Sequence, residues 1–232
     1  SLVIFSAHGV SSAVEEETKS RNLNFFDATC PLVTKVHMEV RKHAKASKDI
    51  ILVGHEGHPE VEGTMGRHIN SDNSSIYLVQ NELDAKNIKI NNPTKLALVT
   101  QTTLSVDETK SIIDILKYRF PDIDIPKKDD ICYATQNRQD AVKQLALESD
   151  FMIVVGSKNS SNSNRLSELA EKCGCRSILI DEFTDIDLDD LKNYSKISIT
   201  AGASAPESKV MEIAKSLELH TDAEIIEHGE DN

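Results

Sequence analysis

The chain has 232 residues, of which 39% are hydrophobic and 28% are charged, and its formal net charge is −12. This composition is typical of a folded globular protein, and the length allows one large domain or two of ordinary size. No apolar run reaches membrane-spanning length, and the negative charge argues against nucleic acid as a partner. Four cysteines are too few for a disulfide scaffold and favour a reducing compartment, so we expect a cytoplasmic location.

The chain begins with Ser1 and runs directly into an apolar stretch, "LVIFS", without an initiator methionine. We therefore expect it to be a piece of a longer protein. Targeting signals are not readable from such a piece, which leaves an organellar location open.

Apolar runs alternate along the chain with amphipathic stretches, which predicts an α/β fold of parallel sheets flanked by helices. Strands are predicted at residues 2–6, 24–27, 50–54, 75–79, 95–100, 151–155, 177–180 and 196–200. Helices are predicted at 11–20, 32–46, 106–119, 136–148, 163–172 and 206–217. The strands "IILVG" and "FMIVVG" are apolar throughout, as expected for strands buried on both faces.

The second half of the chain resembles the first. Cys30 and Cys132 have the same spacing as Gly54 and Gly156, which end the two most apolar strands. This repeat predicts a pseudo-symmetric architecture of three small α/β units, in which the first unit is incomplete and its missing part, upstream, carries a third cysteine. The alternative to a true repeat is that the two halves are similar only because all doubly wound α/β units look alike. The predicted boundaries are 1–30 for the remnant of the first unit, 31–127 and 128–217 for the next two, and 218–232 for an acidic tail.

Most of the unusual polar residues follow the predicted strands. The loops "SAHGVS", "DATCP", "GHEGHPEVEGT", "TQTTLS", "DICYATQNR", "GSKNSSNSNRL" and "TAGASAPES" all lie at such positions. Open parallel sheets bind their ligands at the carboxyl ends of the strands, so these loops are expected to form the functional site.

Two cysteines lie in these loops. Pro31 is placed to open a helix, which puts Cys30 at the helix N-terminus, where the helix dipole favours a thiolate. Thiolates on matched loops could bind zinc or an iron–sulfur cluster, although a single cysteine is more often a small buried hydrophobe. Cys173 and Cys175 lie at a predicted helix end capped by Gly174, and we interpret them as structural or surface thiols.

The loop "GSKNSSNSNRL" offers hydroxyl, amide and backbone N–H groups to an anion, beyond what capping a helix requires. The loop "TAGASAPES" offers Ser204 and a second helix start, and His8 and His58 are further candidate donors, although a lone histidine is usually a surface residue. Glu60, at the start of a short predicted helix, is either a proton donor or a favourable first-turn charge.

With these motifs together, the chain resembles the 4-hydroxy-3-methylbut-2-enyl diphosphate reductase family, also called LytB. The resemblance covers residues 1 to about 215 and is carried by "FSAHGVS", "DATCPLV", "GHEGHPEVEGTMG", "VTQTTLS", "DDICYATQNRQ" and "VVGSKNSSNSNRL". It implies three similar α/β units around a central [4Fe–4S] cluster. It also implies the last step of the non-mevalonate isoprenoid pathway, a reductive dehydroxylation that forms isopentenyl and dimethylallyl diphosphate with two electrons and protons.

The resemblance also assigns roles to residues of this sequence. Cys30 and Cys132 would be thiolate ligands of the cluster, whose fourth iron would take the substrate hydroxyl. Glu60 would deliver the proton, and Thr102 would position the hydroxyl. The groups that would bind the diphosphate or relay protons are His8, His58, Ser160, Ser161, Asn162 and Ser204. The resemblance implies that the family's third cysteine and one further histidine would lie upstream of Ser1.

The resemblance implies a small-molecule diphosphate substrate and an electron donor such as ferredoxin or flavodoxin, and we expect a monomer. A predicted basic helix face could dock such a donor, but a solvated face is the simpler interpretation. Its residues are Lys35, Arg41, Lys42, Lys45 and Lys48. Two alternatives stay open: a non-redox α/β protein that binds a phosphorylated small molecule without a metal, and a zinc hydrolase.

Overall fold

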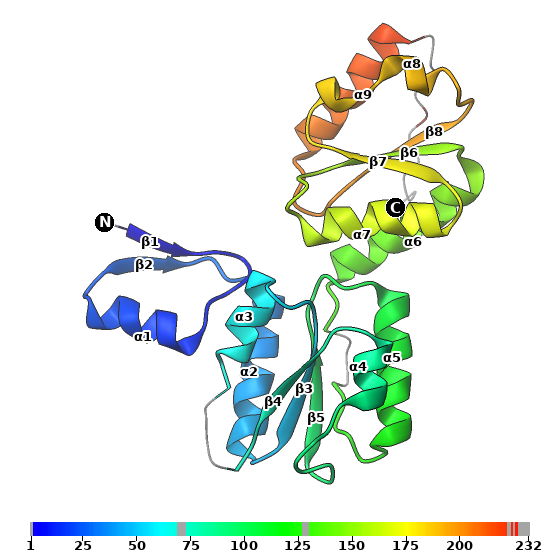
Figure 1. The fold of residues 1–232 in the computed structure, drawn as a ribbon. Helices are drawn as coiled ribbons and strands as arrows, with labels where there is room; N and C mark the ends of the chain where they lie inside the picture. The colour runs from blue at the N-terminus through cyan, green and yellow to red at the C-terminus, as the bar shows by residue number, and fades with distance from the viewer. Residues whose placement is uncertain (1, 69–72, 127–129, 222–223, 225, 227–232) are drawn as a thin grey trace. The chain divides into compact units, whose positions relative to one another are not determined.

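The computed structural model describes residues 2–68, 73–126, 130–221, 224 and 226. The chain divides into two compact units, Ser1–Cys132 and Tyr133–Asn232 (Figure 1). Most of the expected acidic tail, and residues 128–129 at one expected boundary, lie outside the described residues. The boundaries expected from the repeat stay a prediction.

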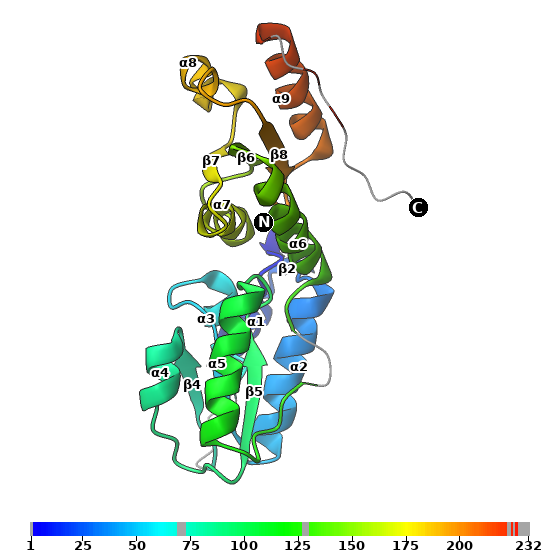
Figure 2. The same cartoon turned by 90° about the vertical axis from the view of Figure 1, so that its right-hand side faces the viewer.

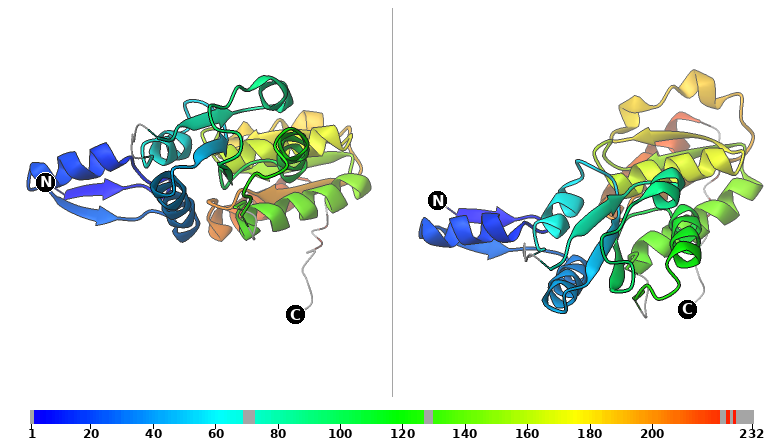
Figure 3. Two further views of the ribbon diagram at one scale, coloured as in Figure 1. Left: turned by 90° about the horizontal axis from the view of Figure 1, so that it is seen from below. Right: turned by 60° about the horizontal axis from the view of Figure 1, so that its bottom comes forward.

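The first unit begins with a small β–α–β segment. Strands β1 (Leu2–Phe5) and β2 (Asn24–Asp27) pair in parallel, and helix α1 (Ser12–Ser20) lies along one face of the pair (Figure 3). Ser11 caps α1, because its side chain accepts a hydrogen bond from the backbone N–H of Val14. The carboxyl ends of both strands thus lead into the loops that carry the sequence motifs.

A three-stranded parallel sheet with the order β4–β3–β5 forms the rest of the first unit. Its strands are β3 (Asp49–Val53), β4 (Ile76–Val79) and β5 (Leu96–Thr100). Its helices are α2 (Pro31–Lys45), α3 (Pro59–Met65), α4 (Glu82–Asn87) and α5 (Val106–Arg119). Helices α4 and α5 lie beside one another on the opposite face from α2 and α3 (Figures 1 and 2).

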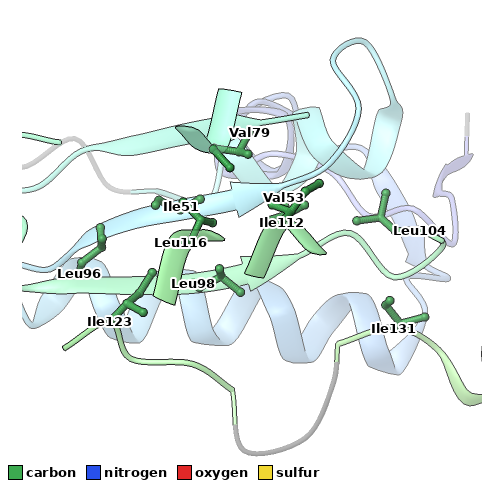
Figure 4. Close-up of a cluster of buried hydrophobic side chains, with 11 residues drawn as sticks. Ile51, Val53, Val79, Leu96, Leu98, Leu104, Ile112, Leu116, Ile123 and Ile131 are labelled. Carbon is green, nitrogen blue, oxygen red and sulfur yellow. The ribbon is translucent and has the colours of Figure 1, made fainter. Parts of the chain in front are cut away.

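The central strand of this sheet is buried on both faces. Ile50 and Leu52 belong to the core under α2, whereas Ile51 and Val53 pack with the apolar face of α5 (Figure 4). All four side chains are at most 1% exposed, and each such burial stabilises the fold by about 1.5–3 kcal/mol. A rigid sheet therefore holds the strand-end loops in place.

The second unit repeats this design with the order β7–β6–β8. Its strands are β6 (Phe151–Val155), β7 (Arg176–Ile180) and β8 (Ile197–Ala201). Its helices are α6 (Tyr133–Glu148), α7 (Ser161–Lys172), a 3-10 turn (Phe183–Asp185), α8 (Leu188–Leu191) and α9 (Glu207–His220). Met152 and Val154 face the core under α6 and α7, and Phe151 and Ile153 face the core that α9 completes.

The α/β class is confirmed, and the described strands form parallel sheets of two, three and three strands. Every predicted strand and helix is present. Helices α4 and α8 were not predicted, because their 6 and 4 residues are too short to show a helical period. Helix α6 begins at Tyr133, earlier than the expected residue 136. No helix within the described residues is long and apolar enough to cross a membrane.

Candidate functional site

The loop after β1 packs directly onto helices α2 and α3. Gly9 has a φ of +74°, and a Cβ at this position would lie 2.5 Å from Cε1 of His37. A Cβ on Gly63 would lie 3.1 Å from the carbonyl oxygen of Gly9. This close approach brings the ring of His8 against that of His58, with centroids 5.3 Å apart and planes at 88°. Two histidines expected at the site therefore lie side by side.

Glu60 is buried, with 2% of its surface exposed, although it is a carboxylic acid. Its Oε1 accepts a hydrogen bond of 2.6 Å from the backbone N–H of Thr102, and its Oε2 accepts one of 3.0 Å from the Thr102 hydroxyl. Burial raises the pKa of Glu60 to about 7, although these two hydrogen bonds oppose the rise. At neutral pH the carboxyl group is therefore divided between its protonated and ionised forms, as suits a proton donor.

His58 caps helix α3. Its Nδ1 accepts a hydrogen bond of 3.2 Å from the backbone N–H of Glu60, so the ring carries its proton on Nε2. Burial, with smaller contributions from His8 and His55, lowers the pKa of His58 to about 4. The ring is therefore neutral at pH 7. The sequence suggested that the carboxyl group of Glu60 lies near His58. In the structure, His58 accepts its hydrogen bond from the backbone N–H of Glu60, whereas the carboxyl group of Glu60 accepts hydrogen bonds from Thr102.

Cys30 is the N-cap of α2, directly before Pro31, and its side chain makes no capping hydrogen bond within the described residues. Its backbone N–H donates to the carbonyl oxygen of Ala7 at 3.0 Å, which anchors it beside the loop that carries His8. The backbone N–H of Cys132 donates to the carbonyl oxygen of Thr102 at 2.9 Å. Each cysteine is thus fixed by its backbone to one loop of the same site.

Neither cysteine is in a disulfide bond, both residues are half-buried, and a thiolate is a suitable ligand for a soft metal ion. Among the described residues, no three or more His, Cys, Asp or Glu side chains are grouped as a metal site. The thiols of Cys30 and Cys132 suit an iron–sulfur cluster in kind, but such a cluster needs a further ligand from outside the described residues.

In the second unit, the N-terminus of α7 holds unpartnered polar groups. Ser160 is the N-cap, and its hydroxyl accepts a 3.3 Å hydrogen bond from the backbone N–H of Ser163. Asn162 is 5% exposed, and neither its Oδ1 nor its Nδ2 has a hydrogen-bond partner among the described residues. Leaving such groups unpaired is costly, which indicates that a ligand or solvent satisfies them.

Ser163 lies in the loop "GSKNSSNSNRL", which the sequence predicts to bind an anion, but it was not singled out as a site residue. It is completely buried, and its hydroxyl also lacks a partner among the described residues. A Cβ on Gly156 or Gly202 would lie 2.3 or 2.0 Å from its Oγ, so Ser163 fills the space between the ends of β6 and β8. In the sequence, the glycines directly after β6 and β8 were the signal that a side chain fills this space. Ser161 is half-buried in the first turn of α7, and Ser204 is exposed after β8.

The remaining cysteines lie elsewhere in the second unit. Cys175 is 1% exposed and belongs to the core under α6 and α7. Cys173 is exposed and caps α7, followed by Gly174 with a φ of +87°. Neither thiol lies in the loops after the strands.

Comparison with known proteins identifies relatives along almost the whole chain. A family model described as LytB protein matches residues 1–218. A 4-hydroxy-3-methylbut-2-enyl diphosphate reductase from Saccharophagus degradans is 59% identical over 216 residues, covering 93% of this chain and 70% of that protein. The reductase of the same name from Alcanivorax borkumensis is 57% identical over 233 residues, covering 100% of this chain and 75% of that protein.

Two solved structures are similar as well. The E-1-hydroxy-2-methyl-but-2-enyl-4-diphosphate reductase from Plasmodium falciparum matches with a TM-score of 0.87 and 39% identity, over 93% of this chain and 67% of that one. An (E)-4-hydroxy-3-methyl-but-2-enyl diphosphate reductase, described as the terminal enzyme of the non-mevalonate pathway, matches with a TM-score of 0.60 and 28% identity. This match covers 94% of this chain and 76% of that one. On these matches, the chain belongs to the LytB family of 4-hydroxy-3-methylbut-2-enyl diphosphate reductases.

Proposed function

We infer that this chain provides most of the active site of a reductase that converts (E)-4-hydroxy-3-methylbut-2-enyl diphosphate to isopentenyl and dimethylallyl diphosphate. In this reaction the bond between the allylic carbon and the hydroxyl oxygen breaks. Two electrons and two protons are consumed: one proton leaves with the hydroxyl group as water, and the other is added to carbon. The observation that carries the proposal is the buried carboxyl group of Glu60, held by Thr102, whose carbonyl oxygen also fixes Cys132.

We assign the delivery of the first proton to Glu60. A hydroxide ion is a poor leaving group, so the departing oxygen needs a proton from a donor that is still protonated at neutral pH. Burial raises the pKa of Glu60 to about 7, which meets this requirement. The hydroxyl group of Thr102 contacts the same carboxyl group at 3.0 Å and could orient the substrate hydroxyl toward it. His58, held neutral, is available as a hydrogen-bond donor through Nε2.

Cys30 and Cys132 would hold a [4Fe–4S] cluster together with a third cysteine from the longer protein. When bound, the cluster supplies electrons and a Lewis-acidic iron to the reaction. This chain's contribution is to keep two free thiols at fixed positions beside the loops of His8 and Thr102. A one-electron carrier such as ferredoxin or flavodoxin would be the partner, and the monomeric state and cytoplasmic location stay predictions.

The diphosphate would be bound largely by neutral donors. Asn162 has an amide nitrogen without a partner in the described structure, at the positive end of the α7 dipole. The other groups proposed here are His8, His58, Ser160, Ser161 and Ser204. A chain with a net charge of −12 avoids charge repulsion at the substrate by using uncharged hydrogen-bond donors of this kind.

The test uses the full-length protein, purified and reconstituted without oxygen. Iron and sulfide analysis should give a cluster whose visible absorption bleaches on reduction. Incubation with the substrate and a one-electron reductant should yield both diphosphate products. Bound zinc, or substrate binding without iron and without turnover, would refute the proposal in favour of a hydrolase or a non-redox binding protein.

A further inference from the structure

Asp130 is a completely buried carboxylate outside the residues assigned above. Its side chain is 0% exposed. Oδ1 accepts a hydrogen bond of 2.9 Å from the ammonium group of Lys35, and Oδ2 accepts one of 3.1 Å from the backbone N–H of Thr100. A buried carboxylate is tolerated only when it is paired in this way. Its two oxygen atoms therefore connect three segments that lie far apart in the sequence.

Each of these segments leads to a residue of the proposed site. Lys35 belongs to α2, the helix whose N-cap is Cys30. Thr100 ends β5, directly before the loop in which Thr102 holds Glu60. Asp130 itself lies two residues before Cys132.

The electrostatic surroundings of Asp130 also connect it to the proton donor. Glu39 on α2 lies 3.8 Å from the same lysine, and its pKa is raised by burial and next by the charge of Asp130. The pKa of Glu60 is raised mainly by burial, and Asp130 adds to the rise. Among the described residues, these contacts and pKa shifts link Asp130 to Lys35 and Glu39 of α2 and to Glu60 of α3.

A second lysine–aspartate pair provides a comparison. Lys48, just beyond the last turn of α2, binds Asp124 at 2.8 Å, but the Asp124 side chain is 49% exposed. Asp124 pairs with the first half of β5, since it forms a bridge with Ala97. The same helix and strand are therefore linked twice, by an exposed pair at one end and by the buried carboxylate at the end with the cysteines. Exposed pairs contribute little to stability.

We propose that Asp130 is a positioning residue of the reductase site, which fixes the Cys30 helix and the Cys132 segment to the end of β5 beside the Glu60–Thr102 pair. The proposal rests on the proposed function. Replacing a buried ion pair by apolar residues often leaves stability unchanged, so the pair is better explained by the arrangement that it enforces. Its loss should loosen both thiols with respect to the proton donor.

The test compares Asp130→Asn with the matched variant Asp124→Asn in the full-length, reconstituted protein. Asparagine keeps the shape and can still accept from Thr100, but it loses the ion pair with Lys35. An iron chelator should remove iron from Asp130→Asn at least about tenfold faster than from the unsubstituted protein, the usual range for partners of metal ligands. Asp124→Asn should stay within about twofold.

A second measurement separates positioning from general stability. The pH at which kcat changes because Glu60 ionises, which is one limb of the pH profile of kcat, should be lower in Asp130→Asn, because a neighbouring negative charge is gone. The same limb should stay in place in Asp124→Asn. Faster iron loss with an unmoved limb would reduce Asp130 to a structural residue and overturn the proposal. A folded Asp130→Asn protein that keeps its iron as the unsubstituted protein does would also overturn it.

If Asp130→Asn does not fold, Lys35→Met decides, since it breaks the ion pair between the Cys30 helix and Asp130 and leaves the hydrogen bond from Thr100 to Asp130 in place. Faster iron loss from this variant supports the proposal, and an unchanged rate contradicts it. The proposed function is judged separately on the unsubstituted protein. If that protein binds no iron or gives no products, the reductase assignment fails, whatever the variants do.

Discussion

Replacing Glu60 by glutamine should stop catalysis while making the protein more stable at neutral and alkaline pH. Glutamine has nearly the same shape and can keep the hydrogen bond from the backbone N–H of Thr102, so the fold and the iron should be retained. It has no proton to deliver. We expect kcat to fall by about 100-fold or more, which corresponds to about 2.7 kcal/mol of lost transition-state stabilisation.

The gain in stability follows from the pKa of Glu60, which rises from 4.5 to about 7 on folding. Below pH about 4.5 the carboxyl group is protonated in the folded and in the unfolded state, so it does not change the free energy of unfolding. As the pH rises from about 4.5 to about 7, the carboxyl group ionises in the unfolded state before it does in the folded state, so the folded protein loses up to about 3 kcal/mol of stability, and the loss levels off above the folded pKa. The glutamine variant has no group to ionise, so its advantage over the unsubstituted protein should grow with pH.

The assay is urea unfolding of the two apoproteins at pH 4.5 and pH 8, together with turnover of the reconstituted proteins. The difference in unfolding free energy between the two proteins should be larger at pH 8 by about 3 kcal/mol. A difference that does not change with pH would show that Glu60 ionises normally. Turnover near the normal rate would mean that the proton comes from water or from the diphosphate, and loss of the iron would make Glu60 a structural charge.

Three further outcomes are expected. In the full-length protein, Cys30→Ser should lose cluster iron and turnover, whereas Cys173→Ser should keep both, as iron analysis would show. Asn162→Ala should weaken substrate binding, measured by calorimetry, by about 1.5–3 kcal/mol, the usual value for a hydrogen bond to a charged group. Gly202→Ala should lower the free energy of unfolding by about 1–3 kcal/mol because its Cβ would lie 2.0 Å from the hydroxyl of Ser163, and Ser163→Ala should restore part of that loss.

The sequence was informative where local physics decides the structure. The short apolar run "IILVG", ended by a glycine, predicts a strand buried on both faces, and β3 is buried at each of its five residues. Pro31 fixed the start of α2 and thereby placed Cys30 at its N-cap. The first turn of α3 around Glu60 was recognisable for the same reason, since a proline opens that helix as well.

The partners of the buried carboxyl groups were not readable, because they depend on contacts between distant residues. Thr102, which holds Glu60, lies 42 residues away from it, and Lys35 lies 95 residues from Asp130. In the sequence, Asp130 opens the loop "DICYATQNR", which was expected at the functional site, but nothing in this stretch indicates that its side chain is buried or paired with Lys35. Its complete burial results from the docking of α2 onto β5, which no local pattern encodes.

Several groups proposed to face the substrate carry little or no negative charge at neutral pH. This explains how an acidic chain could bind a diphosphate. Glu60 is kept partly protonated by burial, and His58 is kept neutral by burial and by the bond to its Nδ1. Asn162 is uncharged and lies at the positive end of a helix dipole. Asp130, the carboxylate proposed to hold this arrangement, is paired with Lys35 and shielded from solvent. Negative charge is therefore used for positioning, while uncharged donors are left for the anion.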